Sequence, residues 1–243
     1  GRHYVIEHEG KIIHLPSVTT IIGATSDNSW LDAWKKRVGE KKAEEISKFS
    51  ANRGTYMHLL CENFLDSMLP SKKERLMYTL EETNKWGKDN KLTDAEMEEG
   101  RKLFFNFYRT GTFDKIKAIV MQESKLYSLI GGGYAGRVDF IYVNEKGEHI
   151  IGDFKTSKKP KRWEDIDVYK MQIAAYYVAY WQLYKVKPLC GEIWISNNYD
   201  DEPQIFTVSK SDIKKYYTEF INRVKTYHAI HTAVDADEFL KDL

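Results

Sequence analysis

The stretch that decides the fold runs from Tyr134 to Lys159 and reads YAGRVDFIYVNEKGEHIIGDFKTSKK. It contains two strand-like apolar runs, separated by the turn sequence Asn144-Glu145-Lys146-Gly147. A third strand-like run begins at Ile116, ends at Tyr127 and is joined to the stretch through Gly131-Gly132-Gly133. Because short turns connect neighbouring antiparallel strands, we expect an antiparallel meander in a central sheet.

Around this meander the sequence predicts helices and two further strands. Apolar residues recur at helical spacing over residues 30–38, 41–68, 71–90, 94–109 and 166–184, and a last amphipathic helix follows Ser211-Asp212 and ends at about Ile230. Strands are expected at 191–196 and 204–208, and a small hairpin at 3–14. This order predicts a mixed α/β fold whose central sheet, built around residues 116–208, is flanked by helices.

A single domain is expected over residues 1–243, because no Pro-, Gly- or Ser-rich linker divides the chain. Residues 1–111 form its mainly helical N-terminal part, residues 112–230 its sheet-containing core and residues 231–243 a tail. With 42% hydrophobic and 30% charged residues, the composition is that of a globular protein rather than a disordered or collagen-like one.

Charge and cysteine content exclude several classes of protein. The 37 basic and 36 acidic residues leave a net charge of +1, so binding to nucleic acid must come from local basic patches. Cys61 and Cys190 are too few for a disulfide framework or an iron–sulfur cluster, and we expect buried thiols. No apolar run approaches the ~20 residues of a membrane span, and no signal sequence opens the chain. We therefore expect a soluble intracellular protein that does not bind a membrane.

Three acidic residues lie on consecutive predicted strands. Asp153 and Lys155 are two residues apart on one strand and project to the same face, while Phe154 points to the other. Asp139 interrupts the apolar run before them, and Glu123 lies on the strand before that. The Asp-x-Lys pair alone is more often an edge-strand ion pair, but carboxylates on strands ~4.8 Å apart repel one another unless a cation lies between them. Oxygen ligands favour Mg²⁺ or Mn²⁺ over zinc.

Lys155 and two helices complete the candidate site. Beside a metal, Lys155 would stabilise negative charge that develops on a phosphoryl group, and it need not be the base. Gln172 and Tyr176 are spaced i, i+4 and share a helix face, as do His58 and Glu62 on an earlier helix. The alternative interpretations are tyrosine packing against the sheet and a structural His–Glu hydrogen bond.

A basic run follows the Asp-x-Lys pair directly. Residues 155–162 read KTSKKPKR and contain five basic residues and no acidic one. Such runs are usually solvated loops, but one that begins at a metal site is a plausible phosphate clamp. Lys35, Lys36 and Arg37 beside Trp34 form a second, weaker candidate.

The motifs occur in one order along the chain: His58/Glu62, Glu123, Gly-x-x-Asp ending at Asp139, Asp-x-Lys at Asp153/Lys155, and Gln-x-x-x-Tyr at Gln172/Tyr176. Taken together they resemble the RecB-like nucleases of the PD-(D/E)xK superfamily. The segments 15–19, 53–58, 133–136 and 153–160 are further similar to the mitochondrial genome-maintenance exonucleases and their phage relatives. The strand before the Asp-x-Lys pair lacks the Pro-Asp of the superfamily name, as is common in the RecB-like branch.

The resemblance implies a metal-dependent DNA exonuclease that prefers single strands with free ends and acts in DNA replication, repair or recombination. By this resemblance, Asp139 and Asp153 bind Mg²⁺ or Mn²⁺, and Glu123 and His58 complete the metal site. Lys155 would be the catalytic lysine, and Gln172 would orient the substrate or the lysine. Residues expected to contact DNA are Tyr176, Lys158, Lys159, Lys161, Arg162, Arg53 and Ser157.

In such enzymes helices arch over the active site, and analogy assigns this role to residues 71–110. No iron–sulfur cluster is expected. The resemblance further implies a monomer that relies on a helicase or a replication or recombination partner for unwinding. Bacterial or phage-infected cytoplasm and the mitochondrial matrix are the locations it is compatible with.

Two other functions compete with this interpretation. A structure-specific or restriction-type endonuclease would use the same metal chemistry on the same fold. A DNA-end-binding module would hold DNA without cutting it, but such a module is expected to have lost a metal carboxylate or the lysine. A structural protein with ion-paired acids would bind no divalent cation.

Overall fold

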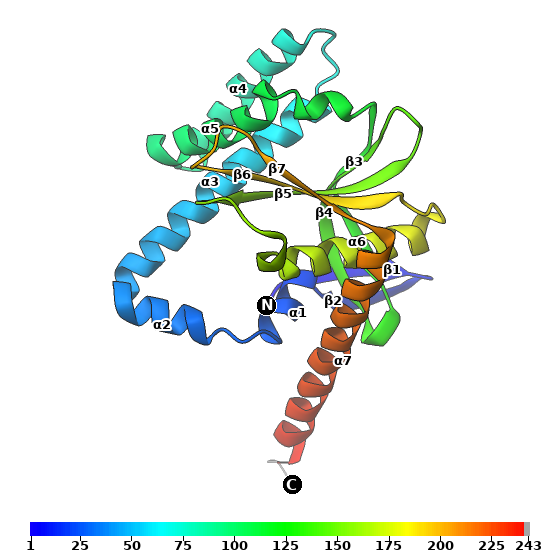
Figure 1. Cartoon of the computed structure of the whole chain (residues 1–243). Coiled ribbons are helices and arrows are strands. Elements are labelled where there is room, and N and C mark those ends of the chain that lie inside the picture. The colour runs from blue at the N-terminus through cyan, green and yellow to red at the C-terminus, as the bar shows by residue number, and fades with distance from the viewer. Residues whose placement is uncertain (241–243) are drawn as a thin grey trace.

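The computed structural model describes the backbone of residues 1–240 and the side chains of residues 1–231. Its centre is a five-stranded sheet in the order β3-β4-β5-β6-β7 (Figure 1). The strands are β3 (Ala118–Ser128), β4 (Tyr134–Val143), β5 (His149–Ser157), β6 (Cys190–Asn197) and β7 (Gln204–Val208). β3, β4 and β5 form the predicted antiparallel meander. β5 and β6 are parallel and are connected by the crossover helix α6 (Asp167–Tyr184).

Helices cover both faces of this sheet. On one face α3 (Glu40–Asp66) and α5 (Asp94–Arg109) pack against aromatic residues of the strands, with α4 (Lys72–Asp89) packed on α3. On the other face lie α1 (Val18–Ala24), α6 and α7 (Lys210–Leu240), whose contacts with the strands are mainly aliphatic. Three short 3₁₀ segments occur at Thr112–Lys115, Ile130–Gly132 and Trp163–Asp165. The predicted mixed α/β fold, with a central sheet flanked by helices, is confirmed.

Because side chains alternate along a strand, β5 contributes residues to both faces of the sheet. Phe154 stacks on Phe140 at 4.3 Å between ring centroids and contacts Trp194 edge-on, so it belongs to the aromatic layer. Asp153 and Lys155, its neighbours, point to the opposite side of the strand, as alternation requires. The carboxylate and the ammonium group therefore lie together on the α6 side of the sheet.

The N-terminal segment forms a separate small sheet beside the main one. β1 (His3–His8) and β2 (Lys11–Pro16) are an antiparallel hairpin, and Ser17 then forms a bridge to Ala135 of β4. The Ser17 side chain accepts a hydrogen bond from the Thr20 amide and so caps α1. This arrangement places the start of the chain beside β4.

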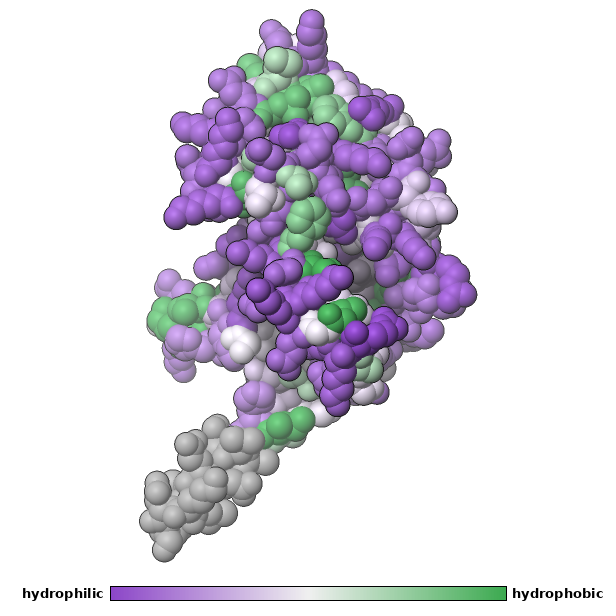
Figure 2. All heavy atoms as spheres, turned by 90° about the vertical axis from the view of Figure 1, so that its left-hand side faces the viewer, coloured by the Kyte–Doolittle hydropathy of each residue, from purple (hydrophilic) through white to green (hydrophobic). Residues whose placement is uncertain are grey.

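The helix α2 (Ser29–Val38) has no buried residue and meets α3 at an angle at the junction between the two helices (Figure 1). Seen from that side, hydrophilic side chains cover most of the surface, with one hydrophobic group at the end where α4 lies and smaller ones elsewhere (Figure 2). Exposed apolar residues at that end include Met68, Leu69, Met77 and Tyr78.

The last helix is longer than predicted. α7 continues past Ile230 to Leu240, and the predicted tail at 231–243 is therefore helical as far as it is described. Residues 231–240 contain no glycine or proline, the residues that most often end a helix. Residues 241–243 of the tail lie outside the described residues.

Both cysteines are buried thiols, as predicted. Among the helices described, none has the length and apolar character that crossing a bilayer would require.

Candidate metal and catalytic site

The site lies where β4 and β5 separate. Their ladder ends at the pair Phe140↔Gly152, so Asp139 and Asp153 follow where the backbones no longer pair. Instead, Asp139 Oδ2 accepts a hydrogen bond of 2.8 Å from the Phe154 amide. A side chain thus satisfies a backbone donor that the sheet leaves open, and this bond fixes the Asp139 carboxylate at the gap.

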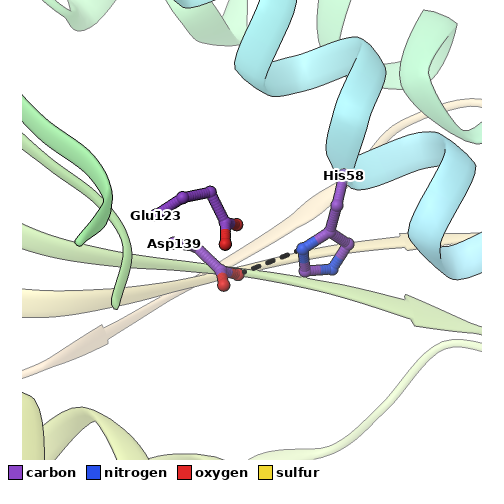
Figure 3. Close-up of side chains that lie close together, drawn as sticks. All are labelled: His58, Glu123 and Asp139. Atoms are coloured by element: carbon purple, nitrogen blue, oxygen red, sulfur yellow. Dashed lines mark ion pairs between the residues drawn. The ribbon is translucent and has the colours of Figure 1, made fainter. Parts of the chain in front are cut away.

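Three side chains converge beside this gap (Figure 3). One ligating atom from each of His58, Glu123 and Asp139 lies within 4.8 Å of the others. His58 Nδ1 is 3.4 Å from Asp139 Oδ2. His58 projects from α3, while Asp139 and Glu123 come from adjacent strands. Each is partly exposed, so the cluster opens to a cavity of about 590 Å³.

The backbone around Glu123 is unusual. The flanking pairs Gln122↔Phe140 and Ser124↔Val138 set Glu123 opposite Asp139, but the two residues do not pair in the ladder. Glu123 has φ +45°, a left-handed conformation that is uncommon for a residue other than glycine. Such strain clusters at functional sites, where the surrounding structure holds it in place. Here it accompanies the placement of a carboxylate beside Asp139.

The pKa values of His58, Glu123 and Asp139 are all shifted towards the less charged form. Burial, together with the neighbouring Asp139 and Glu62, raises the pKa of Glu123 to about 7. Burial also raises the pKa of Asp139, against the opposing effects of Lys155 and the Phe154 amide. Burial and the nearby Lys155 lower the pKa of His58 to about 4, so its imidazole is neutral and able to ligate at neutral pH.

These residues fit a divalent cation. Two carboxylates and a neutral imidazole, with further buried carboxylate oxygens nearby, are a donor set for a hard or borderline cation. The nitrogen ligand suits Mn²⁺ at least as well as Mg²⁺. Which ion binds stays a prediction.

Lys155 lies between a carboxylate and an aromatic ring. Its Nζ is 2.5 Å from Asp153 Oδ2 and 5.2 Å from the centre of the Tyr169 ring. Burial opposes the charged form, but Asp153 and Asp139 outweigh it and raise the pKa of Lys155. The ammonium group is thus held charged beside the cluster.

Asp153 is placed differently from the sequence prediction. It does not belong to the group of three converging ligands, and it does not line the cavity. Its side chain is fully buried, and apart from the ion pair with Lys155 its oxygens have no hydrogen-bond partner. Burial and Asp139 raise its pKa to about 6, although Lys155 opposes them. Its part in metal binding stays a prediction, for which Oδ1, the oxygen outside the ion pair, is available.

Gln172 and Tyr176 both line the cavity, as their shared helix face predicts. The Gln172 amide donates a hydrogen bond of 3.3 Å to the Tyr176 hydroxyl. Tyr176 packs so closely on Gly136 that a β-carbon there would lie 2.6 Å from its ring. The aromatic ring is therefore mostly buried and forms part of the cavity wall.

The predicted DNA-contacting residues outside this helix do not line the cavity. Arg53 is buried and donates hydrogen bonds of 2.7 Å to Glu99 and Asn198. Ser157 is also buried, and its hydroxyl donates to the Lys159 carbonyl. Arg162 is exposed and paired with Asp165 through two hydrogen bonds. The remaining members of the basic run, which lie outside the cavity as well, are Lys158, Lys159 and Lys161.

The placement of an arch at residues 71–110 is wrong. α4 and α5 lie within the aromatic layer and pack on α3 (Figure 1). No residue from this segment lines the cavity. The apolar positions of these helices, such as Leu103, Phe104 and Phe107, are fully buried. This requirement for burial keeps the segment on the body of the protein.

Sequence reasoning missed several residues of the cavity wall. Arg137 lies two residues before Asp139, and this strand spacing was a usable signal. Tyr169, three residues before Gln172 on α6, does not line the cavity, but its ring lies 5.2 Å from Lys155 Nζ, and its helical spacing from Gln172 was a usable signal. No local pattern indicated Tyr4, which reaches the cavity from β1, whereas Thr19 of α1 belongs to the segment 15–19 that the resemblance singled out.

A family model for the PD-(D/E)XK nuclease superfamily matches residues 33–238, most of the chain. The chain belongs to this superfamily. No curated protein sequence matches it. Among solved structures it is similar to a "Putative exonuclease" from Eubacterium rectale, with 14% identity and a TM-score of 0.42 over 63% of each chain. It is also similar to the protein SSO0001, with 18% identity and a TM-score of 0.33 over 67% of this chain and 83% of that one. The chain thus spans 63% of the length of the first of these proteins.

We expect cation binding to strengthen as pH rises through 7. In the folded metal-free protein Glu123 keeps its proton up to about pH 7, because its pKa is raised. In the unfolded chain the same carboxyl group loses the proton nearer its ordinary pKa. That contribution to stability is present at low pH and is lost as pH rises towards 7. A cation must displace the proton below this point, so the increase in Tm caused by Mn²⁺ should be larger at about pH 8 than at about pH 5.5. Thermal melts at both pH values, with Glu123→Gln as the comparison, measure this difference. An equal increase at both pH values in the wild type would contradict the assignment.

Tyr169 is expected to position Lys155. Removing the ring in Tyr169→Leu should lower kcat several-fold, since a cation–π contact contributes roughly 0.5–2 kcal/mol. KM should change little, and Tyr169→Phe should restore most of kcat because it keeps the ring. Steady-state kinetics on a labelled oligonucleotide separate the two parameters. A loss of kcat in Tyr169→Phe equal to that in Tyr169→Leu would show that the ring is not what matters.

Proposed function

We propose that the protein is a divalent-metal-dependent deoxyribonuclease that acts as an exonuclease on single-stranded DNA with free ends. The observation that carries the proposal is the convergence of His58, Glu123 and Asp139 beside the charged Lys155, in one cavity of a PD-(D/E)XK nuclease fold. We further propose that it serves DNA replication, repair or recombination.

The roles of the residues follow from their positions. A bound Mg²⁺ or Mn²⁺ supplies Lewis-acid polarisation of the scissile phosphodiester and makes a water molecule more acidic. Asp139 and Glu123 provide negative ligands, and His58 provides a neutral one. Lys155 stabilises negative charge that develops on the phosphoryl oxygens. Gln172 and Tyr176 form the wall against which the strand is oriented.

The binding-module alternative finds no support in the sequence, because Asp139, Asp153 and Lys155 are all present. The endonuclease alternative shares the proposed metal chemistry, so only the substrate separates it from an exonuclease. We therefore keep the endonuclease as an outcome of the test.

The test uses labelled single-stranded, duplex and circular single-stranded DNA with Mg²⁺, Mn²⁺ or a chelator. We expect hydrolysis of linear single strands with either ion, none with chelator and none of the circle. Cleavage of the circle would identify an endonuclease. Wild-type protein that leaves every substrate intact with both ions would overturn the nuclease assignment. Separate 5′ and 3′ labels report the direction of degradation.

A further inference from the structure

Arg137 lies beside the candidate metal ligands His58, Glu123 and Asp139 and lines the same cavity. It precedes Asp139 by two residues on β4, and both line the same cavity. Its side chain is 52% exposed, against 28% for Glu123 and 14% for Asp139. Exposure thus increases from the carboxylates outward to the guanidinium group, which faces any ligand that approaches the cluster.

The guanidinium group is only loosely engaged. Within the described part of the chain, its one ion pair joins a single nitrogen, NH1, to Glu123 Oε2 at 3.6 Å. This distance is longer than that of a good hydrogen bond, whereas Arg53 contacts its own carboxylate at 2.7 Å. A guanidinium group carries five N–H donors in a planar fork, so most of the donors of Arg137 have no partner among the side chains that the structure describes.

The charges around Arg137 indicate why it is held in this way. Arg137 acts on both Glu123 and Glu62 and opposes the burial that raises the pKa of each. Arg137 therefore balances part of the negative charge of Glu123 and Glu62 when no cation is bound. A cation bound by Glu123 would take over this neutralisation and weaken the attraction between Glu123 and Arg137.

Lys155, another cation that lines the cavity, cannot serve the same purpose. Lys155 lies on the inner side, where its side chain is 18% exposed and its ammonium group is paired with the fully buried Asp153. Arg137 lies on the outer side and is accessible. A phosphodiester held at the cluster would thus lie in a cavity that both the buried Lys155 and the exposed Arg137 line.

We propose that Arg137 binds a backbone phosphate of the substrate strand, and that Glu123 holds the guanidinium group until a divalent cation engages the carboxylate. Two parallel N–H donors match the non-bridging oxygens of a phosphodiester. This inference rests on the proposed nuclease function and adds a substrate-binding residue to it. The competing role is that of a structural counter-ion, which would stabilise Glu123 and never contact DNA.

The experiment compares Arg137→Ala with Lys125→Ala. Lys125 pairs with Arg137 across the β3–β4 ladder, is exposed and does not line the cavity, so it controls for the loss of one nearby positive charge. Fluorescence anisotropy measures the Kd for a labelled single-stranded oligonucleotide at several salt concentrations, with Ca²⁺ as the probe ion and intact DNA verified afterwards. Calorimetry measures the Kd for Mn²⁺ alone.

We expect Arg137→Ala to weaken oligonucleotide binding on the order of tenfold and to flatten its salt dependence by about one phosphate contact. Its affinity for Mn²⁺ should be unchanged or higher, because Glu123 is no longer shared. Arg137→Lys should keep the salt slope and recover part of the affinity. Lys125→Ala should change both quantities much less.

Equal effects of Arg137→Ala and Lys125→Ala on Kd and salt slope would overturn the inference. So would a loss of Mn²⁺ affinity in Arg137→Ala without any change in DNA binding, which is the signature of a structural counter-ion. If Arg137→Ala melts early, Arg137→Gln provides a neutral side chain of similar length for the same comparison. Failure of the wild type to cut DNA would refute the nuclease function but would leave this binding comparison interpretable.

Discussion

Replacing Lys155 by alanine should lower the rate of phosphodiester hydrolysis by at least about 10²–10³-fold, the effect of losing one preorganised donor in an active site. The reason is its position: the ammonium group lies beside the metal cluster and is kept charged by Asp153 and Asp139. Release of label from an oligonucleotide with Mg²⁺ measures the rate. Lys146→Ala, in an exposed turn, is the control and should keep full activity.

The same substitution has a second, separable effect on stability. Asp153 would remain fully buried without its counter-charge, and breaking a buried pair in this way costs about 3–5 kcal/mol. The double variant Lys155→Ala/Asp153→Asn should therefore melt at a higher temperature than Lys155→Ala, yet remain inactive. Activity above about a tenth of the wild-type rate in Lys155→Ala would contradict the catalytic role, because no loss of folding can explain retained activity.

Replacing Asp139 by asparagine should abolish cation binding. Losing a residue that only supports a metal ligand costs roughly 10–100-fold in affinity, and losing the ligand itself should cost more. Asparagine keeps an oxygen that can accept the Phe154 amide but lacks the charge that a cation requires. Calorimetry with Mn²⁺ measures the change, and hydrolysis should be lost with it. Asp114→Asn removes one exposed acidic charge away from the cavity and serves as the control.

Asp139→Ala separates ligation from folding. It removes the charge and also leaves the Phe154 amide without its acceptor, which should lower the free energy of unfolding by about 1–3 kcal/mol more than Asp139→Asn does. Thermal melts of the two metal-free variants measure this difference. Undiminished Mn²⁺ affinity in both variants would show that Asp139 is not a ligand.

Much of the sheet was predictable, because strand alternation and turn residues are local properties. The turn at Asn144–Gly147 joins β4 to β5 as expected, and Asp153 and Lys155 share a face of β5 while Phe154 packs on the other. The order of the motifs likewise indicated the superfamily that the family model matches. These inferences needed only spacing within single elements.

The composition of the metal cluster was less predictable. Adjacency of strands suggested that Glu123, Asp139 and Asp153 converge, but β4 and β5 separate after Gly152, and Asp153 turns to Lys155 within the protein. His58 enters the cluster instead, carried there by α3, whose apolar face packs on the aromatic layer of the sheet. The position of His58 depends on how α3 packs against the sheet, and residue spacing along the chain does not predict that packing.

For this protein the sequence by itself determined most strands and helices, the projection of Asp153 and Lys155 to one face of their strand, and the family, since each depends on periodicity or on motif order. Only the tertiary structure decided that Tyr4 lines the cavity, that Arg53 is buried against Glu99, and that α4 and α5 lie away from the site. The physical reason is that burial of apolar surface fixes how the layers pack. Charged side chains are then exposed or enclosed according to that packing.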